Sequence, residues 1–210
     1  MERLWCVLAG YLFGSFLTAD LIVLCRTGAR RAEGFGNPGM ANVASRLGTG
    51  SGLLVLAGDI LKTAAACALC RLWLFPGMGR MAVLYAGLGA VLGHCWPVWN
   101  GFRGGKGVAV AGAASILFSP PVGIASYLLG AAAVLAMGYL AVGSAVIAVS
   151  LPLLTALFGL GREAAAAAGV IGGVMLVRHS GNFARMRAGT EGRASVASRL
   201  KAYLKRKSFH

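Results

Sequence analysis

A short glycine-rich segment, residues 34–43, carries residue types that bind phosphate groups. Its glycines let backbone N–H groups turn toward an anion, and a helix that begins near Asn42 would direct its positive end to the same place. The letters match G-x-G-x-x-G, but a dinucleotide site needs a preceding strand, which this sequence does not offer. A plain tight turn between two helices is the alternative. Asn37, Asn42 and, one turn further on, Arg46 lie in or directly after this short segment, and they favour a phosphate site over the plain turn.

A second glycine-rich segment surrounds Lys106. It is not a Walker motif, because Gly107 stands where a serine or threonine would follow the lysine. A lysine between glycines at the start of a helix still combines a point charge with exposed amides and the helix dipole, which suits a phosphate monoester. Alternatively, Lys106 only sets the orientation of the chain in a membrane. The expected phosphate ligands are Gly104, Gly105, Lys106 and Gly107.

A third polar segment, residues 178–191, follows the last apolar stretch. His179, Asn182 and Arg185 recur every three residues, so one helix face presents an imidazole, a carboxamide and a guanidinium. Such a face can bind a small polyol phosphate, whereas the simpler alternative is a solvated helix beside the membrane. Glu191 closes the segment and is assigned a supporting role.

Two ionisable residues, Asp59 and Lys62, stand three positions apart inside an apolar stretch. They share a helix face, and a lone charge at that depth in a membrane costs several kcal/mol. We therefore expect the two side chains to pair and to face the protein interior. A structural role beneath the site is favoured over a catalytic one, and His94, just before the second glycine-rich segment, is placed in the same supporting group.

The composition indicates which class of fold positions these residues. Of 210 residues, 58% are hydrophobic and only 12% are charged, which leaves too few polar side chains for the surface of a soluble globule. Several apolar stretches reach the ~20 residues that a helix needs to cross ~30 Å of hydrocarbon. We expect an all-α, polytopic integral membrane protein with about seven transmembrane helices, over residues 4–25, 51–75, 81–99, 107–119, 121–137, 144–160 and 164–178.

The charge is unbalanced, with 20 Lys and Arg against 6 Asp and Glu. In a soluble protein this excess would indicate a nucleic-acid partner, but the positive-inside rule accounts for it here, and no nucleic acid is expected. Most cations fall in the glycine-rich loops and the C-terminal segment. This distribution predicts an N-terminus outside and a cytoplasmic C-terminus, with residues 1–25 as a retained first helix rather than a cleaved signal peptide.

The chain is expected to form a single transmembrane domain over residues 1–192, followed by a tail over residues 193–210. The tail alternates basic with apolar side chains, which is typical of an amphipathic helix on anionic lipid. A merely solvated tail is the alternative.

One cysteine pair, Cys67 and Cys70, has C-x-x-C spacing inside an apolar stretch. A redox or zinc site needs a loop or helix start and further ligands, which the surrounding sequence lacks. We interpret both residues as small hydrophobic side chains, and no metal is expected.

The order of these motifs along the chain resembles the bacterial acyl-phosphate:glycerol-3-phosphate acyltransferase family (PlsY). The resemblance covers nearly the whole chain and implies a seven-helix fold with its motifs at the cytoplasmic face of the bacterial plasma membrane. It also implies transfer of a fatty acyl group from acyl phosphate to glycerol 3-phosphate, which yields lysophosphatidic acid without acyl-CoA, metal or other cofactor. The matching motifs are Gly14-Ser15, Gly36-Asn37-Pro38-Gly39 with Asn42, Asp59-Ile60-Leu61-Lys62, Gly93-His94 with Pro97, Gly104-Gly105-Lys106-Gly107, and Arg178-His179 with Asn182, Arg185, Gly189 and Glu191.

By this resemblance, Lys106 and Arg46 neutralise phosphates, while His179 and Asn182 position glycerol 3-phosphate, and these four are the expected catalytic residues. The resemblance also implies that Asn37, Asn42 and the glycine amides, including those of Gly36 and Gly39, line the phosphate cavity. The partners would be acyl phosphate, glycerol 3-phosphate and membrane lipids, and the protein is expected to be a monomer. Acyl phosphate is an activated mixed anhydride, so no nucleophilic side chain is required, and proton removal by a substrate phosphate is a hypothesis.

The sequence departs from the family pattern at several positions where hydroxyl or charged side chains are common. Each hydrogen bond lost to a charged group is worth ~1.5 to 3 kcal/mol. Two interpretations remain, an acyltransferase with an altered pocket and a non-catalytic paralogue that binds lipid phosphates or regulates a lipid enzyme. A small-solute transporter ranks third, because no repeat indicates one. The departures are Phe35 for serine, Ala41 for threonine, Val110 for threonine, Ala141 for serine and Gly181 for glutamate.

Overall fold

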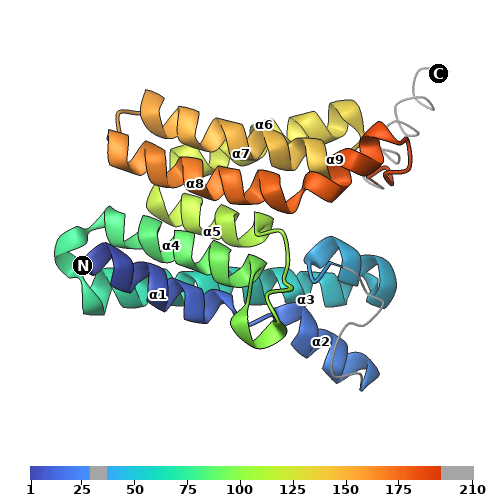
Figure 1. Ribbon diagram of the computed structural model, residues 1–210, viewed down its shortest axis with the longest axis horizontal. Coiled ribbons are helices and arrows are strands. Elements are labelled where there is room, and N and C mark those ends of the chain that lie inside the picture. The colour runs from blue at the N-terminus through green and yellow to red at the C-terminus, as the bar shows by residue number, and fades with distance from the viewer. Residues whose placement is uncertain (29–36, 195–210) are drawn as a thin grey trace, which may run out of the picture. The chain divides into compact units, whose positions relative to one another are not determined.

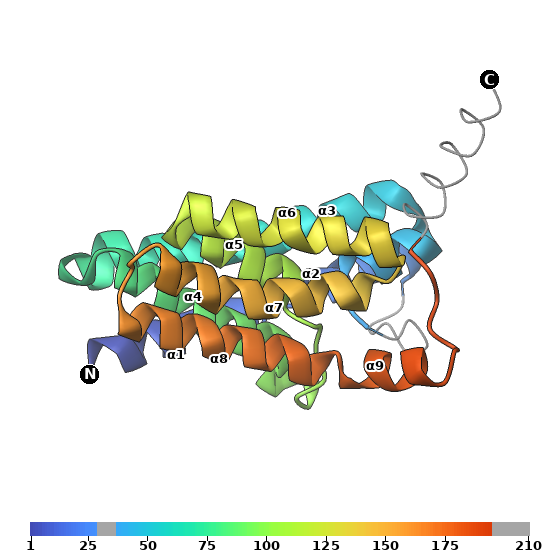
Figure 2. The same ribbon diagram turned by 90° about the horizontal axis from the view of Figure 1, so that it is seen from above.

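The computed structural model describes residues 1–28 and 37–194, and every regular element in these ranges is a helix (Figures 1 and 2). The predicted all-α fold is therefore confirmed. Gly36, Phe35 and residues 195–210 of the predicted tail lie outside the described residues. The chain divides into two compact units, Met1–Pro120 and Pro121–His210. The single domain predicted over residues 1–192 stays a prediction.

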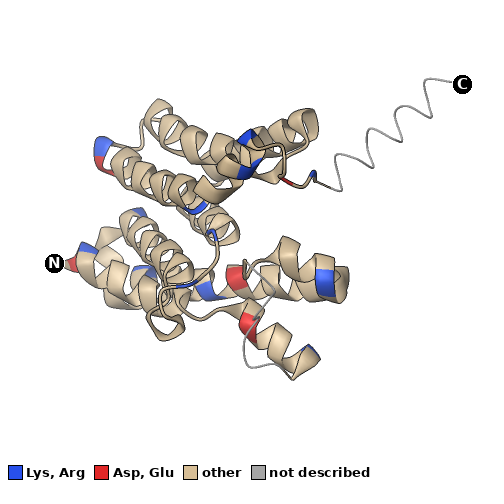
Figure 3. Ribbon diagram, turned by 45° about the vertical axis from the view of Figure 1, so that its right-hand side comes forward, with Lys and Arg blue, Asp and Glu red and all other residues tan. Residues whose placement is uncertain are grey.

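Five helical segments of the described chain are long and apolar enough to cross a membrane. Arg162–Arg178 and Ser180–Arg187, which are bent by 48° at residue 179, give a sixth only when they are counted as one span, and Val108–Phe118 is apolar but short. Figure 3 shows most of each helix uncharged, with many of the charged residues near helix ends and loops. A polytopic membrane fold follows, whereas the count of seven spans and the orientation of the termini stay predictions. The five segments are Glu2–Thr27, Met40–Leu74, Arg80–Asn100, Pro120–Met137 and Leu140–Leu157.

The first span is broken, which corrects the prediction of one continuous helix over residues 4–25. Helix α1, Glu2–Gly14, ends before Ser15, and α2, Thr18–Thr27, begins after Leu17. Leu17 has an extended backbone with φ −88° and ψ 102°. The break therefore leaves backbone carbonyls without their usual helical partners in the middle of an apolar segment.

The next two spans also differ from their predicted bounds. Helix α3, Met40–Ala68, starts earlier than residue 51 and is kinked at Gly48, whose φ of 83° and ψ of 161° are not helical. It continues as the π-helix η1, Leu69–Leu74, and the short 3-10 helix η2, Pro76–Met78, follows. Helix α4, Arg80–Cys95, stops before residue 99 because the chain leaves the helix at Trp96, before Pro97. The remaining elements of this unit are η3, Val98–Asn100, and α5, Val108–Phe118.

Helices α1 and α4 pack backbone against backbone through small residues. A Cβ added at Gly10 would overlap the carbonyl oxygen of Ala86, and one added at Gly14 would overlap that of Ala90. Glycines on α4 meet the backbone of α1 in the same way. Close approach of this kind is how membrane helices gain van der Waals contact where lipid provides no hydrophobic driving force. The α1–α4 interface thus sets the position of His94 at the end of α4.

The second unit contains the long helices α6, Pro120–Met137, α7, Leu140–Leu157, and α8, Arg162–Arg178 (Figure 1). Helices α7 and α8 approach closely at Gly172, where an added Cβ would overlap the carbonyl oxygen of Ala148. The short helix α9, Ser180–Arg187, follows α8 after the bend. This unit positions the third polar segment of the sequence.

Candidate functional site

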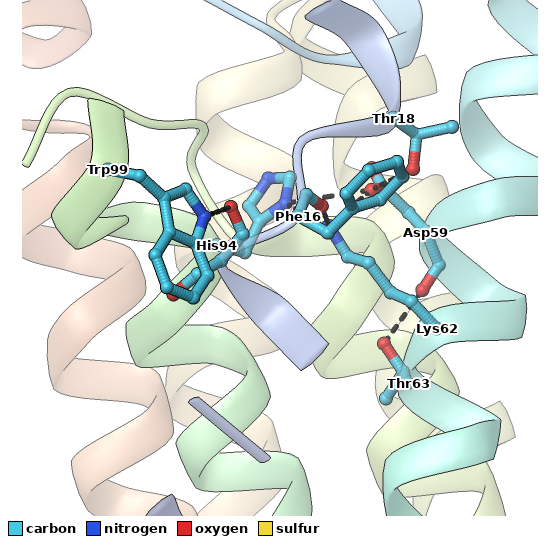
Figure 4. A network of polar contacts seen from close by, with 8 residues as sticks. Phe16, Thr18, Asp59, Lys62, Thr63, His94 and Trp99 are labelled. Atoms are coloured by element: carbon cyan, nitrogen blue, oxygen red, sulfur yellow. Dashed lines mark hydrogen bonds and ion pairs between the residues drawn. The ribbon is translucent and has the colours of Figure 1, made fainter. Parts of the chain in front are cut away.

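A buried ion pair lies at the break of the first span. The Nζ of Lys62 is 2.7 Å from Oδ1 of Asp59, and both side chains are buried, which confirms the predicted pairing (Figure 4). The same Nζ donates a hydrogen bond of 2.8 Å to the carbonyl oxygen of Phe16. Lys62 of the ion pair on α3 thus supplies a hydrogen-bond donor to the Phe16 carbonyl oxygen, which lies in the break between α1 and α2.

The ion pair extends into a polar network that joins α2, α3 and α4 (Figure 4). Nδ1 of His94 lies 3.0 Å from Nζ of Lys62 and 3.6 Å from Oδ1 of Asp59. The hydroxyl of Thr18 donates to Asp59 Oδ1 at 3.2 Å, and that of Thr63 donates to the Asp59 carbonyl oxygen at 2.7 Å. The buried charges are therefore paired and hydrogen-bonded, as burial in a low-dielectric interior requires.

Two aromatic side chains form hydrogen bonds that connect the loop after α4 to the end of α1 and the α1–α2 break. The indole Nε1 of Trp99 donates to the carbonyl oxygen of Ser15 at 3.0 Å (Figure 4). The hydroxyl of Tyr11 donates to the carbonyl oxygen of Trp96 at 2.6 Å. Backbone carbonyls inside a membrane need such partners, because no water is present to replace them. The sequence motif Gly14-Ser15 marked this position, but its partners were not predicted.

The second glycine-rich segment folds directly over His94. The amide of Gly105 donates to the His94 carbonyl oxygen at 2.9 Å. A Cβ added at Gly104 would overlap that same oxygen, and one added at Gly105 would overlap the imidazole Nε2. Gly107 has φ 77° and precedes the first residue of α5, so the predicted helix start after half-buried Lys106 is confirmed. Only glycines allow the segment to approach the histidine this closely.

The described part of the first glycine-rich segment forms a closed turn before α3. The amide of Gly39 and the side-chain Nδ2 of Asn42 both donate to the carbonyl oxygen of Asn37, at 2.9 and 3.0 Å. Helix α3 begins at Met40, close to the predicted start at Asn42. Arg46 lies on an exposed part of this helix. The Asn42 side chain thus closes the turn onto the Asn37 main chain, and Arg46 follows one helical turn later.

The third polar segment lies at the bend between α8 and α9. Nδ1 of buried His179 is 2.7 Å from the carbonyl oxygen of Met175. Because a carbonyl oxygen only accepts, Nδ1 carries the proton and Nε2 of the neutral ring is an acceptor. The 48° bend at this residue corrects the picture of one continuous helix face, since Asn182 and Arg185 belong to α9 and His179 precedes it.

Glu191 ties the polar residues of α9 together. Its Oε1 accepts a hydrogen bond of 2.6 Å from Nδ2 of Asn182, and its Oε2 accepts one of 2.7 Å from Nε of Arg185. An ionised carboxylate only accepts, so the Asn182 amide must turn its NH₂ toward Glu191. Gly181 leaves no carboxylate on α9 itself, and Glu191 supplies one from the following loop. Glu191, for which a supporting role is predicted, thus contacts two predicted site residues, Asn182 and Arg185.

The chain after Glu191 returns to the turn between α6 and α7. The amide of Ala194 donates to the carbonyl oxygen of Gly138 at 2.8 Å, and the guanidinium of Arg193 lies 5.7 Å from the ring centroid of Tyr139. A cation over an aromatic face is attracted by the ring quadrupole. These contacts of residues 191–194 were not predicted, because nothing in the sequence around a single arginine of a basic tail indicates which residue it contacts.

The predicted site residues therefore form three groups. In the first group, Lys62 and Asp59 contact His94, which contacts the Gly104–Gly107 segment. In the second, Asn37, Gly39 and Asn42 form the turn at the start of α3, the helix that carries Arg46. In the third, His179 precedes α9, on which Asn182 and Arg185 share Glu191. In the described ranges, no group of three or more His, Cys, Asp or Glu side chains could hold a metal ion. Cys67 and Cys70 are buried free thiols, as expected of small hydrophobic residues.

The sequence of this chain is similar to those of known glycerol-3-phosphate acyltransferases. The family model of glycerol-3-phosphate acyltransferase matches residues 4–189. The chain belongs to the glycerol-3-phosphate acyltransferase family. A glycerol-3-phosphate acyltransferase of Rubrobacter xylanophilus is 37% identical over 191 residues, which cover 91% of this chain and 94% of the relative. Glycerol-3-phosphate acyltransferase 1 of Lactobacillus acidophilus is 40% identical over 130 residues, but that match spans only 61% of this chain and 62% of the relative's length.

Two crystal structures of PlsY (YgiH), an integral membrane glycerol 3-phosphate acyltransferase, share the fold. The glycerol 3-phosphate form has a TM-score of 0.80 at 30% identity and covers 95% of this chain and 99% of that one. The lysophosphatidic acid form has a TM-score of 0.79 at 32% identity and covers 92% and 95%. The prediction of an acyltransferase family member is confirmed, and the comparisons favour it over the non-catalytic paralogue.

Proposed function

We propose that the protein transfers a fatty acyl group from acyl phosphate to a hydroxyl of glycerol 3-phosphate and so forms lysophosphatidic acid. The observation that carries the proposal is the similarity to the glycerol 3-phosphate form of PlsY over 95% of the chain. The basic and amide side chains of the three groups remain present despite the substituted hydroxyls. Val110 and Ala141 are both buried, and neither side chain carries a hydroxyl.

The reaction needs little covalent participation from the protein. A glycerol 3-phosphate hydroxyl oxygen bonds to the acyl carbonyl carbon, the bond from that carbon to the phosphate oxygen breaks, and the departing phosphate takes the hydroxyl proton. Both substrates are anions, so the protein must reduce their repulsion and hold the hydroxyl at the carbonyl. Cations and oriented amides accomplish both tasks without a side-chain nucleophile.

The Gly104–Gly107 segment of the first group and the turn of the second group are assigned to phosphate binding. Lys106 and Arg46 supply positive charge, and the amides of the Gly104–Gly107 segment supply neutral donors. Lys106 precedes α5, and Arg46 follows the Asn37–Asn42 turn by one helical turn. The remaining ligands that we assign to phosphate are Gly36, Asn37, Gly39 and Asn42.

The third group is assigned to glycerol 3-phosphate. Nε2 of His179 is a hydrogen-bond acceptor, because Nδ1 donates to Met175, and so it suits a substrate hydroxyl. Arg185 carries the charge that a phosphate monoester requires, and Asn182 adds a neutral polar contact beside it. Glu191 keeps both side chains on one side of α9.

The proposed location is the cytoplasmic face of the bacterial plasma membrane. The positive-inside rule supports this orientation, since the basic loops and the basic tail then lie in the cytoplasm. We propose a monomer with a domain over residues 1–192 and a lipid-bound tail over 193–210. Cysteine labelling of Gly77→Cys tests the orientation. The proposed orientation places residues 76–79 outside, so a membrane-impermeant label should react in intact cells. A label that reacts only after the cells are permeabilised would place these residues inside and contradict the orientation.

A direct assay tests the activity. Purified protein in detergent or liposomes receives acyl phosphate and radiolabelled glycerol 3-phosphate, with acyl-CoA as the alternative donor and Lys106→Ala as the control. We expect labelled lysophosphatidic acid with acyl phosphate, little with acyl-CoA, and a loss in the variant. Absence of product from folded protein, under conditions where PlsY is active, would contradict the proposal and favour a non-catalytic lipid-phosphate-binding protein.

A further inference from the structure

We propose that His94 is a positioning residue for the Gly104–Gly107 segment, held by Asp59 and Lys62 in the tautomer that carries its proton on Nε2. This inference rests on the proposed function, because the segment contains the phosphate-binding Lys106. It assigns a defined chemical task to a histidine that the sequence placed only in a supporting group.

The first step concerns the donors of Lys62. An ammonium group has three N–H donors and no acceptor. Three acceptors lie around Nζ of Lys62, namely Asp59 Oδ1 at 2.7 Å, the Phe16 carbonyl oxygen at 2.8 Å and His94 Nδ1 at 3.0 Å. The three contacts come from α3, the α1–α2 break and α4, so the ammonium is held from three elements.

The second step fixes the proton of His94. Because the ammonium can only donate, Nδ1 of His94 must accept, and the neutral ring then carries its hydrogen on Nε2. A competing hydrogen bond from Nδ1 to Asp59 is too long, at 3.6 Å. The ion pair therefore selects one tautomer as well as the orientation of the ring.

The third step places the resulting N–H group. Nε2 fills the space that a Cβ on residue 105 would occupy, and the carbonyl oxygen of His94 accepts the Gly105 amide at 2.9 Å. His94 thus contacts the segment with both its main chain and its ring. The ring, fixed by the ion pair with its N–H on Nε2, lies directly against the backbone at Gly105, and this contact orients the adjacent Lys106 and the glycine amides toward a phosphate before substrate binds.

His179 provides an internal comparison within the same chain. Its Nδ1 donates to a backbone carbonyl oxygen, so its proton lies on the other ring nitrogen from that of His94. The chain has three histidines, and the third, His210, is the last residue of the sequence. A His210→Gln variant leaves two imidazoles whose expected tautomers are opposite.

Nitrogen NMR reads the tautomers without any activity. Protein with His210→Gln and ¹⁵N-labelled histidine is measured in lipid near neutral pH, and each signal is assigned by further substitution of His94 or His179. We expect a protonated Nε2 and an unprotonated Nδ1 for His94, and the reverse for His179. In the Asp59→Asn/Lys62→Met background, the His94 signals should shift toward a mixture. A His94 that is protonated on Nδ1, or a tautomer unchanged in that background, would overturn the proposal.

Kinetics then separate positioning from simple space filling. His94→Gln keeps an N–H at the place of Nε2, whereas His94→Asn keeps polar atoms only near Nδ1. We expect the KM for a phosphate substrate to rise at least about tenfold in His94→Asn and by no more than about threefold in His94→Gln, with kcat changing less. Equal losses in the two folded variants would contradict the positioning role.

An inactive wild-type protein with the expected NMR tautomers would overturn the proposed function and, with it, the role of His94 in positioning a phosphate-binding segment. The assignment of the His94 tautomer would remain.

Discussion

The Nζ of Lys62 donates a 2.8 Å hydrogen bond to the carbonyl oxygen of Phe16, the residue at which the first membrane span is broken. In a continuous helix this carbonyl would accept the amide of Asp20, but that amide instead bonds the carbonyl oxygen of Leu17 at 3.1 Å. A backbone carbonyl without a partner costs several kcal/mol inside a membrane. The buried cation thus stabilises the break, and the break gives the cation a ligand besides Asp59.

Replacing Lys62 alone should be more damaging than replacing the whole pair. Lys62→Met leaves the Asp59 carboxylate buried without its cation, which typically costs about 3 to 5 kcal/mol. The Asp59→Asn/Lys62→Met double variant removes both charges and should lose less. The free energy of unfolding in mixed detergent micelles measures both. A double variant that is less stable than Lys62→Met would show that the pair itself, rather than compensation of a buried charge, stabilises the fold.

Gly105→Ala should reduce activity because its new Cβ overlaps Nε2 of His94. The ring or the segment must shift, and either movement displaces Lys106 from its position. We expect kcat/KM to fall at least about tenfold while the protein still folds, since overpacking at one site typically costs 1 to 3 kcal/mol. Gly77→Ala is the matched control, because a Cβ there meets nothing within 4 Å. Equal activity of the two variants would show that the close contact with His94 has no role in catalysis.

Much of the fold could be predicted from apolar length and residue spacing. Helices α5, α6 and α8 lie within two residues of the stretches expected at 107–119, 121–137 and 164–178. The Asp59–Lys62 pair was predictable because two opposite charges at helical spacing in an apolar segment have few other partners that could neutralise them. Local chemistry was sufficient in these cases.

The parts that could not be predicted depend on partners far away in the sequence. The break at Ser15 and Phe16 lies among apolar residues without a proline, and its partners Trp99 and Lys62 are 84 and 46 positions away. Glu191 lies in a loop, where no helical period indicates which side chain it meets. Sequence spacing identifies residues on one helix face, but it does not identify contacts between elements.

The α1–α4 interface should not tolerate a side chain larger than glycine at its centre. Gly10→Leu places a side chain against the backbone of Ala86, where the added Cβ alone would already overlap the carbonyl oxygen. We expect a loss of about 1 to 3 kcal/mol or more in unfolding free energy and a lower thermal midpoint in detergent. Gly173→Leu on α8 is the control, because an added Cβ meets nothing within 4 Å. Similar midpoints for the two variants would contradict the close packing of α1 on α4.

Glu191 should act on glycerol 3-phosphate through Asn182 rather than through Arg185. The Arg185 side chain is 51% exposed, so its ion pair with Glu191 is screened by solvent and contributes little. The bond from Asn182 is shielded better, since Asn182 is 8% exposed, and it fixes the direction of the amide. Glu191→Gln retains an oxygen that can accept from Asn182, whereas Glu191→Ala retains none.

We therefore expect the KM for glycerol 3-phosphate to rise roughly tenfold or more in Glu191→Ala and much less in Glu191→Gln, because a hydrogen bond to a charged group is worth about 1.5 to 3 kcal/mol. Glu163→Ala, in the first turn of α8, is the acidic control and should leave the KM unchanged. If Glu191→Gln is as impaired as Glu191→Ala while both remain folded, the charge on the carboxylate matters more than its hydrogen bond. In that case the ion pair with Arg185, despite its exposure, would be the contact that orients the helix α9 residues for substrate.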